Sequence, residues 1–312
     1  NLNSGTWSFD LHDLLNTKVA VEIQTIIFFL MFYGLAIRIP LFPLHGWLPM
    51  IAEHGSLAVT GVFLLGIKTG VFGLLHFVLP LFPETVIDWQ EYIVSFAVIG
   101  IFYAAILALM QTDLRRLLAF AVISNTSVMV IGLFTLNHQA IQGSVMLAVN
   151  LGLATILLLF MSGVIYHRTG TAKFSRLGGL FDKIPLIGIA FFIAGLSIIG
   201  MPGTPGFDAA HLMLEASIER FGALLTIAAA MGNVVAAGFL LWAFQQAFLA
   251  PHNDDKEYNI DPVNRKEFLL ASIMILVILV AGFYSEPWLN LIENSVKALE
   301  HIYTSSAFWP GA

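Results

Sequence analysis

One lysine in the middle of an apolar stretch has the clearest potential for chemistry. Lys68 stands in the run LLGIKTGVFG, which has no other charged side chain. A charged group at the centre of a membrane-spanning helix costs at least about 2.5–3.5 kcal/mol, so such residues are rare and usually functional. Burial favours the neutral amine, and a lysine that can release its proton can store a proton and pass it on. The structural alternative is a lysine paired with a carboxylate on another helix.

A second group of titratable side chains follows a cluster of helix-breaking residues, GMPGTPGF at 200–207. Asp208, His211 and Glu215 are spaced i, i+3, i+7, which predicts that they share one face of a helix restarting after Gly206. A carboxylate, an imidazole and another carboxylate in a row are typical of a proton relay. Asp208 has a simpler interpretation as the cap of the new helix, so the relay hypothesis depends mainly on His211.

Residues 37–55, IRIPLFPLHGWLPMIAEHG, contain three prolines directly after an apolar run. Proline removes a backbone donor, and irregular backbone inside a membrane persists only when it is buried in protein or lines a wet cavity. Broken helices of this kind place helix ends and free carbonyls where ions pass. Arg38 and His45 flank this break. Because arginine does not release its proton, Arg38 is interpreted as a fixed charge that biases its neighbours, or as a side chain that reaches the interface.

The segment TDLRRLLAF begins another apolar stretch with two adjacent arginines, Arg115 and Arg116. Arginines at this position more often anchor the topology than conduct ions. Arg115 is nevertheless retained as a candidate pathway residue. Asp113 is predicted to pair with one of the two arginines, an interaction that contributes little at an exposed surface.

The composition predicts an all-α membrane protein. Of 312 residues, 58% are hydrophobic and only 11% are charged, which is too little charge for a soluble surface. The net charge of −6 suggests no nucleic-acid partner, and the absence of cysteine excludes disulfides, thiolate metal sites and iron–sulfur ligation. The sequence contains no nucleotide-binding loop, metal cluster or nucleophile–base set, so no cofactor is expected.

Apolar segments long enough to span a membrane recur along the chain. They are 20–39, 56–81, 92–110, 117–136, 141–166, 186–218, 221–249 and 268–284. The segment 186–218 is too long for one regular span, so we interpret it as a second discontinuous helix. The predicted architecture has about eight transmembrane helices, two of them broken. It divides into an extramembrane segment (1–19), a transmembrane domain (20–285) and an interfacial C-terminal segment (286–312).

The loop charges predict an orientation. Counting crossings places the loops 112–116 and 167–183, which are rich in lysine and arginine, on one side. The connection 81–91 falls on the other side and carries three acids and no basic residue. By the positive-inside rule the basic side faces the cytoplasm, matrix or stroma.

The segments IRIPLFPLHGWLP, LLGIKTGVFGLLHFVLPLFPE, IGIFYAAILALMQTDLRRLLAFAVIS and GMPGTPGF occur in this order. In this combination the chain, from Phe9 to about Tyr284, resembles the antiporter-like subunit of respiratory complex I, of the type called subunit 4 or subunit M. The resemblance implies two inverted repeats, each with one broken helix. It also implies that the chain, which begins with Asn, lacks the N-terminal helices. Either it is a piece of a longer product, or another chain supplies those helices.

The resemblance places Lys68 at the family's central lysine, and His45 and Trp47 also match. Elsewhere the sequence departs from the family pattern. Arg38 stands where the first broken helix usually carries a lysine, and Asn125 and Leu151 replace histidines, with Asn150 beside the latter. Ala210 replaces a glutamate, and Arg115 a lysine. These changes remove titratable groups, for which Asp208, His211 and Glu215 are candidate substitutes.

These observations predict a proton-translocating subunit of a complex-I-like assembly. The chain itself would be a non-catalytic part of an NADH (or ferredoxin):quinone oxidoreductase-type complex. One alternative is a degenerate subunit that docks partners without pumping. Another is a subunit of a cation/proton antiporter, a membrane hydrogenase or an inorganic-carbon uptake complex. The expected partners are other membrane subunits and lipids. The expected location is an energy-transducing membrane, with the bacterial inner membrane favoured over mitochondrial or thylakoid membranes.

Overall fold

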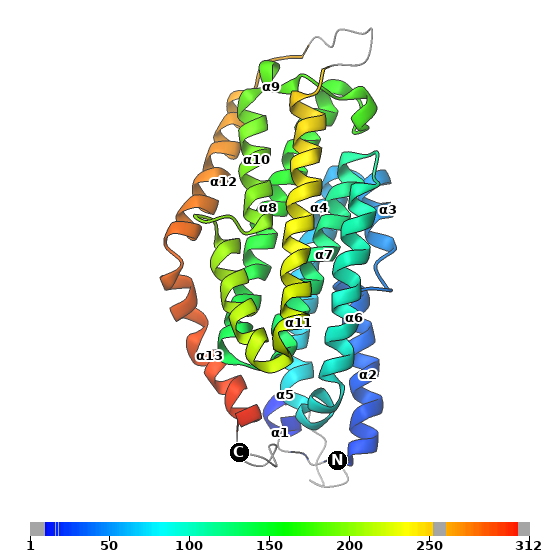
Figure 1. Cartoon of the computed structure of the whole chain (residues 1–312), viewed down its shortest axis with the longest axis vertical. Helices are drawn as coiled ribbons and strands as arrows, with labels where there is room; N and C mark the ends of the chain where they lie inside the picture. The colour runs from blue at the N-terminus through cyan, green and yellow to red at the C-terminus, as the bar shows by residue number, and fades with distance from the viewer. Residues whose placement is uncertain (1–9, 16, 18, 252–259, 305–312) are drawn as a thin grey trace.

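The computed structural model describes residues 10–15, 17, 19–251 and 260–304, which form an elongated bundle of helices (Figure 1). Its helices are α1 (Leu11–Leu15), α2 (Val21–Arg38), α3 (Trp47–His54), α4 (Leu57–Gly73), α5 (Leu79–Leu81), α6 (Pro83–Leu109), α7 (Leu114–Phe134), α8 (His138–Thr169), α9 (Leu180–Lys183), α10 (Pro185–Ile199), α11 (Pro205–Phe244), α12 (Arg265–Phe283) and α13 (Glu286–Thr304). Wider π-helical turns follow α4 (Leu74–Val78) and α11 (Gln245–Leu249), and a 3₁₀ turn covers Phe174–Arg176.

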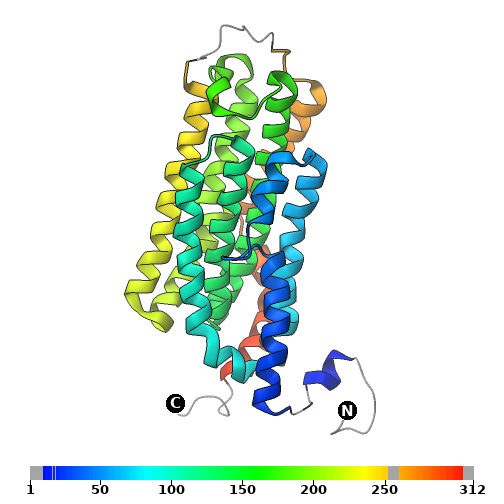
Figure 2. The ribbon, with the colours of Figure 1, turned by 90° about the vertical axis from the view of Figure 1, so that its right-hand side faces the viewer.

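Both predicted helix breaks are present. The first separates α2 from α3, which follow one another along one side of the bundle (Figure 2). The second separates α10 from α11 (Figure 1). There, Gly200 and Gly203 adopt positive φ angles of 81° and 86°, and Pro205 starts the new helix. A proline in the first turn sacrifices no intrahelical hydrogen bond, so the sequence explains both where α10 ends and where α11 begins.

The long helix α11 consists of two rods. Gly222 has φ 78° and ψ 172°, which no helix accommodates, and the chain reverses direction there (Figure 1). Seven helices of the described chain are long and apolar enough to cross a membrane, and α11 is one of them. Because α11 contains two crossings, the first of which completes the span begun by α10, the described residues cross eight times. This confirms the predicted fold class.

The basic loops lie together at one end of the molecule, as predicted. Backbone hydrogen bonds join Leu114 N–H to the Ala172 carbonyl (2.9 Å) and Phe174 N–H to the Thr112 carbonyl (3.0 Å). The turn from α5 to α6 lies at the opposite end (Figure 1). The relative sides of the loops therefore follow the charge pattern, while the compartment that each side faces remains a prediction.

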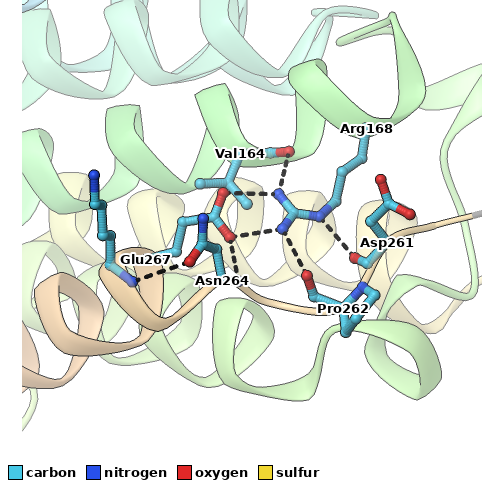
Figure 3. A network of polar contacts seen from close by, with 7 residues as sticks. Val164, Arg168, Asp261, Pro262, Asn264 and Glu267 are labelled. Carbon is cyan, nitrogen blue, oxygen red and sulfur yellow. Dashed lines mark hydrogen bonds and ion pairs between the residues drawn. The ribbon is translucent and has the colours of Figure 1, made fainter.

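The core is centred on α7, which is buried along nearly its whole length between α6, α8 and α11. By contrast, α2 and α12 expose most of their apolar surface. At its start α12 is fixed to α8 by an ion pair (Figure 3). The Arg168 guanidinium donates to both Glu267 carboxylate oxygens, at 3.1 and 2.6 Å, and to the carbonyls of Asp261 and Pro262. Such bidentate pairs combine strength with geometric specificity.

One predicted span boundary changes. The third span begins at Pro83 rather than at residue 92, because residues 84–91, which mix charged and apolar side chains, extend the helix beyond its apolar run. In the C-terminal segment, α13 packs against α8 and α5. Residues 305–312 of that segment, and most of the extramembrane segment 1–19, lie outside the described residues.

Candidate functional site

Lys68 lies in the interior between α4 and α8. Its Nζ atom is buried and has no hydrogen-bond partner in the described part of the chain. A Cβ atom added to Gly152 of α8 would lie 3.3 Å from Lys68 Cε, so the glycine leaves room for the lysine stem. The span from Leu57 to Leu81 has Lys68 near its middle. The described residues thus provide no carboxylate for Lys68, and the paired-lysine alternative is not realised within them.

A polar cluster leads from the basic end of the bundle toward Lys68. The buried Arg115 donates from Nη2 to the Gly55 carbonyl (2.7 Å) and to Thr60 Oγ1 (3.2 Å). Thr60, Arg115 and Thr155 share the lining of a cavity of about 10 Å³, enough for one water molecule. Thr60 precedes Lys68 by eight residues, about 12 Å along α4. On α8, Thr155 is three residues from Gly152, beside which the Lys68 stem lies.

The predicted ion pair of Asp113 with a neighbouring arginine side chain is wrong. Its carboxylate accepts the backbone N–H groups of Arg115 (2.9 Å) and Arg116 (3.1 Å), and so caps α7. Burial raises the pKa of the Asp113 carboxyl, and these two hydrogen bonds oppose the shift. Arg116 instead pairs with Glu53 of α3 at 3.0 Å. The sequence correctly predicted that Asp113 contacts a neighbouring arginine, but not that the contact is made through the backbone N–H groups of both arginines at the start of α7.

At the first break Arg38 and His45 have apolar surroundings. The Arg38 guanidinium lies 5.6 Å from the centre of the Phe63 ring. The ring of His45 is buried, lies 5.2 Å from that of Tyr103, and has an Nδ1 atom without a hydrogen-bond partner among the described residues. Trp47 Nε1 donates to the Ile37 carbonyl at 2.9 Å and so satisfies one of the carbonyls near the broken turn.

The second break is held by an asparagine in the interior. The buried Asn150 of α8 donates to the Ser197 carbonyl (2.9 Å) at the end of α10 and accepts from the Ser197 hydroxyl (2.5 Å). A Cβ at Gly206 would lie 2.2 Å from that same carbonyl, so α11 passes too close for any side chain there. The contact of Asn150 with this break was not predicted from the sequence, although an amide inside an apolar helix is itself a signal.

Asp208, His211 and Glu215 lie on the first rod of α11, but the structure does not bring them to Lys68. His211 Nδ1 is 3.7 Å from Glu215 Oε2, and the two side chains are 65% and 59% exposed. The buried side of this rod carries Ala209, Met213, Ala216 and Ser217 instead. His211 and Glu215 therefore lie together on an exposed side of this rod, whereas Asp208 is half-buried.

A second polar cluster, which the sequence does not predict, lies toward the acidic end. The buried hydroxyls of Thr135 and Ser217 are 3.3 Å apart. Thr135 also lines a cavity of about 250 Å³ together with Glu219, Arg220 and Glu300. Deeper in the bundle, Ser144 donates to the Met129 carbonyl at 3.2 Å. Single serine and threonine residues are common in apolar helices, so the sequence gives little sign that Thr135 and Ser217 lie next to each other.

One leucine separates the two polar clusters. Ser144, Ala148, Leu151 and Thr155 share one side of α8, because they recur at steps of three and four residues. Thr155 belongs to the cluster at the basic end and Ser144 to that at the acidic end. Leu151 is fully buried between them. Along this side of α8 a hydroxyl therefore lies on each side of an apolar layer formed by Ala148 and Leu151, and Lys68 lies beside it. The buried amides of Asn125 and Asn150 also belong to the interior.

Known proteins share the fold of this chain. The sequence profile of the family described as "NADH:quinone oxidoreductase/Mrp antiporter, TM" matches residues 2–236. Subunit M of the NADH-quinone oxidoreductase of Escherichia coli is 29% identical over 311 residues, covering 97% of this chain and 60% of that protein. A chain of respiratory complex I from Thermus thermophilus superposes with a TM-score of 0.88 at 27% identity, covering 96% of this chain and 64% of that one.

A chain of the Mrp complex from Dietzia sp. DQ12-45-1b shares the fold, with a TM-score of 0.79 at 18% identity over 90% of this chain and 60% of that one. The fold and the interior polar groups thus define an antiporter-like integral membrane protein. The chain belongs to the NADH:quinone oxidoreductase/Mrp antiporter family, which confirms the resemblance. It spans about 60% of the length of the curated relatives that it matches.

The contact at the second break predicts a stability effect. Gly206→Ala should destabilise the protein by about 1–3 kcal/mol, because the new methyl group meets the Ser197 backbone rather than a mobile side chain. The readout is the apparent melting temperature of the purified protein. Gly195→Ala in α10 is the matched control, since no atom lies within 4 Å of its added Cβ. Equal melting temperatures for the two variants would contradict the packing at this break.

Proposed function

We propose that the chain is a proton-translocating, antiporter-like subunit of a complex-I-like membrane assembly, and that Lys68 is its central proton carrier. The observation that carries the proposal is the Lys68 amine, buried in mid-span with no partner in the described chain. An amine without a counter-charge in an apolar interior changes its protonation readily when nearby water or charge changes. The chemistry of the assembly would take place on other subunits, and this chain would relay protons only.

In this mechanism the two polar clusters are half-pathways. A proton from the basic side would pass the water-sized cavity lined by Thr60, Arg115 and Thr155 and reach the Lys68 amine. From there it would leave through the hydroxyls of Ser144, Thr135 and Ser217 to the cavity with Glu219 and Glu300. Arg38 would act as a fixed charge beside the first break, and His45 as a titratable group at that break.

The proposed pathway is interrupted at Leu151, where no side chain can bind a proton. The buried leucine offers no group that can bind a proton, and protons cross apolar layers only when water enters them. Translocation would therefore need a transient hydration of this layer during the working cycle. The same leucine, with the aromatic surroundings of His45, supports the second candidate function, a degenerate subunit that docks partners without pumping.

The outward charges of α11 support a partner on that side. Asp208, His211 and Glu215 follow a break within a membrane span, and charged groups there avoid lipid. We expect a polar helix of a neighbouring subunit to cover them, so that they serve as relay residues at a subunit boundary. The longer relatives contain further helices that this chain does not include. We expect such helices, from another chain or from another part of the same one, to pack on the exposed apolar side of α2. Lipid would cover the remaining apolar surface.

The third candidate is a subunit of a related assembly in the same family. The shared fold with a chain of an Mrp complex is the observation that supports it. A cation/proton antiporter, a membrane hydrogenase or an inorganic-carbon uptake complex would use the same interior lysine. In each case the membrane would be an energy-transducing one, with the bacterial inner membrane preferred.

Replacing Lys68 tests the proton-carrier role. Lys68→Met should reduce proton translocation to the background level while the assembly remains intact. Lys68→Arg should fail equally, because an arginine keeps the charge but does not release its proton. The measurement is proton uptake by membrane vesicles that contain the assembly.

The control is Lys297→Met on the exposed part of α13. Normal translocation by Lys68→Met would overturn the proposal. Activity in Lys68→Arg alone would show that the position needs only a fixed charge.

Replacing Leu151 tests the apolar layer. Leu151→His should raise the translocation rate per assembly, because the imidazole adds a titratable group between the two polar clusters. Leu157→His is the matched control, since Leu157 is equally buried in α8 but lies on another side of the helix. If Leu151→His leaves the rate unchanged, or both variants behave alike, the proton pathway does not cross this layer.

A further inference from the structure

The helix that carries Lys68 is held at both ends by side chains from distant parts of the chain. At the basic end, Arg115 of α7 donates to Gly55 and Thr60, where α3 meets α4. At the acidic end, the Tyr303 hydroxyl of α13 donates to the Leu79 carbonyl at 2.6 Å. Lys68 lies eleven residues from both Leu57, where α4 begins, and Leu79.

The Leu79 carbonyl needs an external donor. The last four carbonyls of a helix have no intrahelical partner, and here the helix ends at Leu81. The residue four positions after Leu79 is Pro83, which has no N–H to offer. Leu79 is fully buried, so its carbonyl cannot turn to bulk water. A buried carbonyl without a donor is strongly unfavourable, and the Tyr303 hydroxyl supplies the donor.

Tyr303 is well suited to this contact. Its side chain is buried, with only 2% of the residue exposed. Burial raises the pKa of the phenol, so the hydroxyl keeps its proton and remains a donor. Tyr303 also lines the cavity with Glu219 and Glu300. One residue therefore connects α13, the acidic-end cavity and the helix of Lys68.

Between Lys68 and Leu79 the helix is irregular. The residues Leu74–Val78 form a π-helical turn, which the Leu79 N–H closes onto the Leu74 carbonyl. Such turns are rare and frequently occur at functional sites. Pro80 removes a further backbone donor directly after the turn. Because this segment has fewer internal hydrogen bonds than a regular helix, its position depends more on contacts from outside.

We propose that Tyr303 and Arg115 are positioning residues that hold the Lys68 helix from its two ends and thereby fix the depth of the Lys68 amine in the bundle. The consequence for transport rests on the proposed function. The claim that the two residues hold the helix is independent of the proposed function, because it concerns only the position and stability of the helix.

Hydrogen exchange tests the contact itself. In Tyr303→Phe, which removes only the hydroxyl, amides at 74–82 should exchange roughly tenfold faster in the purified assembly, because the buried carbonyl loses its donor. Tyr284→Phe is the control, since Tyr284 is 63% exposed at the end of α12. Unchanged exchange at 74–82 in Tyr303→Phe would overturn the proposal.

A thiol probe tests the position of residue 68 independently of transport. The chain has no cysteine, so Lys68→Cys introduces its sole thiol. Combining it with Tyr303→Phe should change the rate of labelling by a water-soluble maleimide, whereas combining it with Tyr284→Phe should not. Faster exchange at 74–82 with an unchanged labelling rate would mean that Tyr303 caps the helix end without positioning Lys68, which contradicts the proposal.

Transport completes the test. Tyr303→Phe on the background with Lys68 intact should translocate protons more slowly than Tyr284→Phe at equal assembly content. A normal rate together with altered labelling would overturn the link to transport. The proposed function fails by a different result, normal translocation in Lys68→Met, so the two failures are distinguishable.

Discussion

The structure depends on one constraint, which is that polar and charged groups inside a membrane need partners. The Lys68 amine has no hydrogen-bond partner among the described residues, whereas carbonyls near the two ends of its helix accept hydrogen bonds from side chains. Arg115 and Tyr303 donate to carbonyls at the two ends of its span, and Asn150 donates to the Ser197 carbonyl at the second break. A scaffold that leaves a single amine unpaired in this way keeps its charge state adjustable.

The helix breaks follow from the same constraint. A regular helix hides all of its backbone groups, whereas a broken helix exposes some of them and must place them within protein. In this chain Trp47 satisfies a carbonyl near the first break, and Asn150 with Ser197 does the same at the second. The first break also borders an apolar cavity of about 190 Å³, whose lining includes Leu41, Phe42, Pro43 and Leu44. The cavities with charged or hydroxyl side chains lie instead at the two ends of α7 and α8, where a wet path is expected.

The sequence was sufficient to predict the features that depend on local composition. Spans, both breaks and the mid-span lysine follow from runs of apolar residues interrupted by proline, glycine or charge. It was insufficient where the rotation of a helix against its neighbours decides the outcome. Spacing placed His211 and Glu215 on one face, but only the packing of Met213 and Ala216 turns that face outward. The Tyr303 contact joins positions 224 residues apart, which no local pattern could reveal.

The most direct test of the account is a cryo-EM map of the intact assembly that resolves ordered water around Lys68. If Lys68 carries protons, the map should show water between the Lys68 amine and the cavity of Thr60 and Thr155, and a dry layer at Leu151. It further predicts that no carboxylate from another chain reaches the amine. A dry surrounding in which Lys68 forms an ion pair with a neighbouring subunit would contradict the account, because the lysine would then be a structural charge rather than a proton carrier.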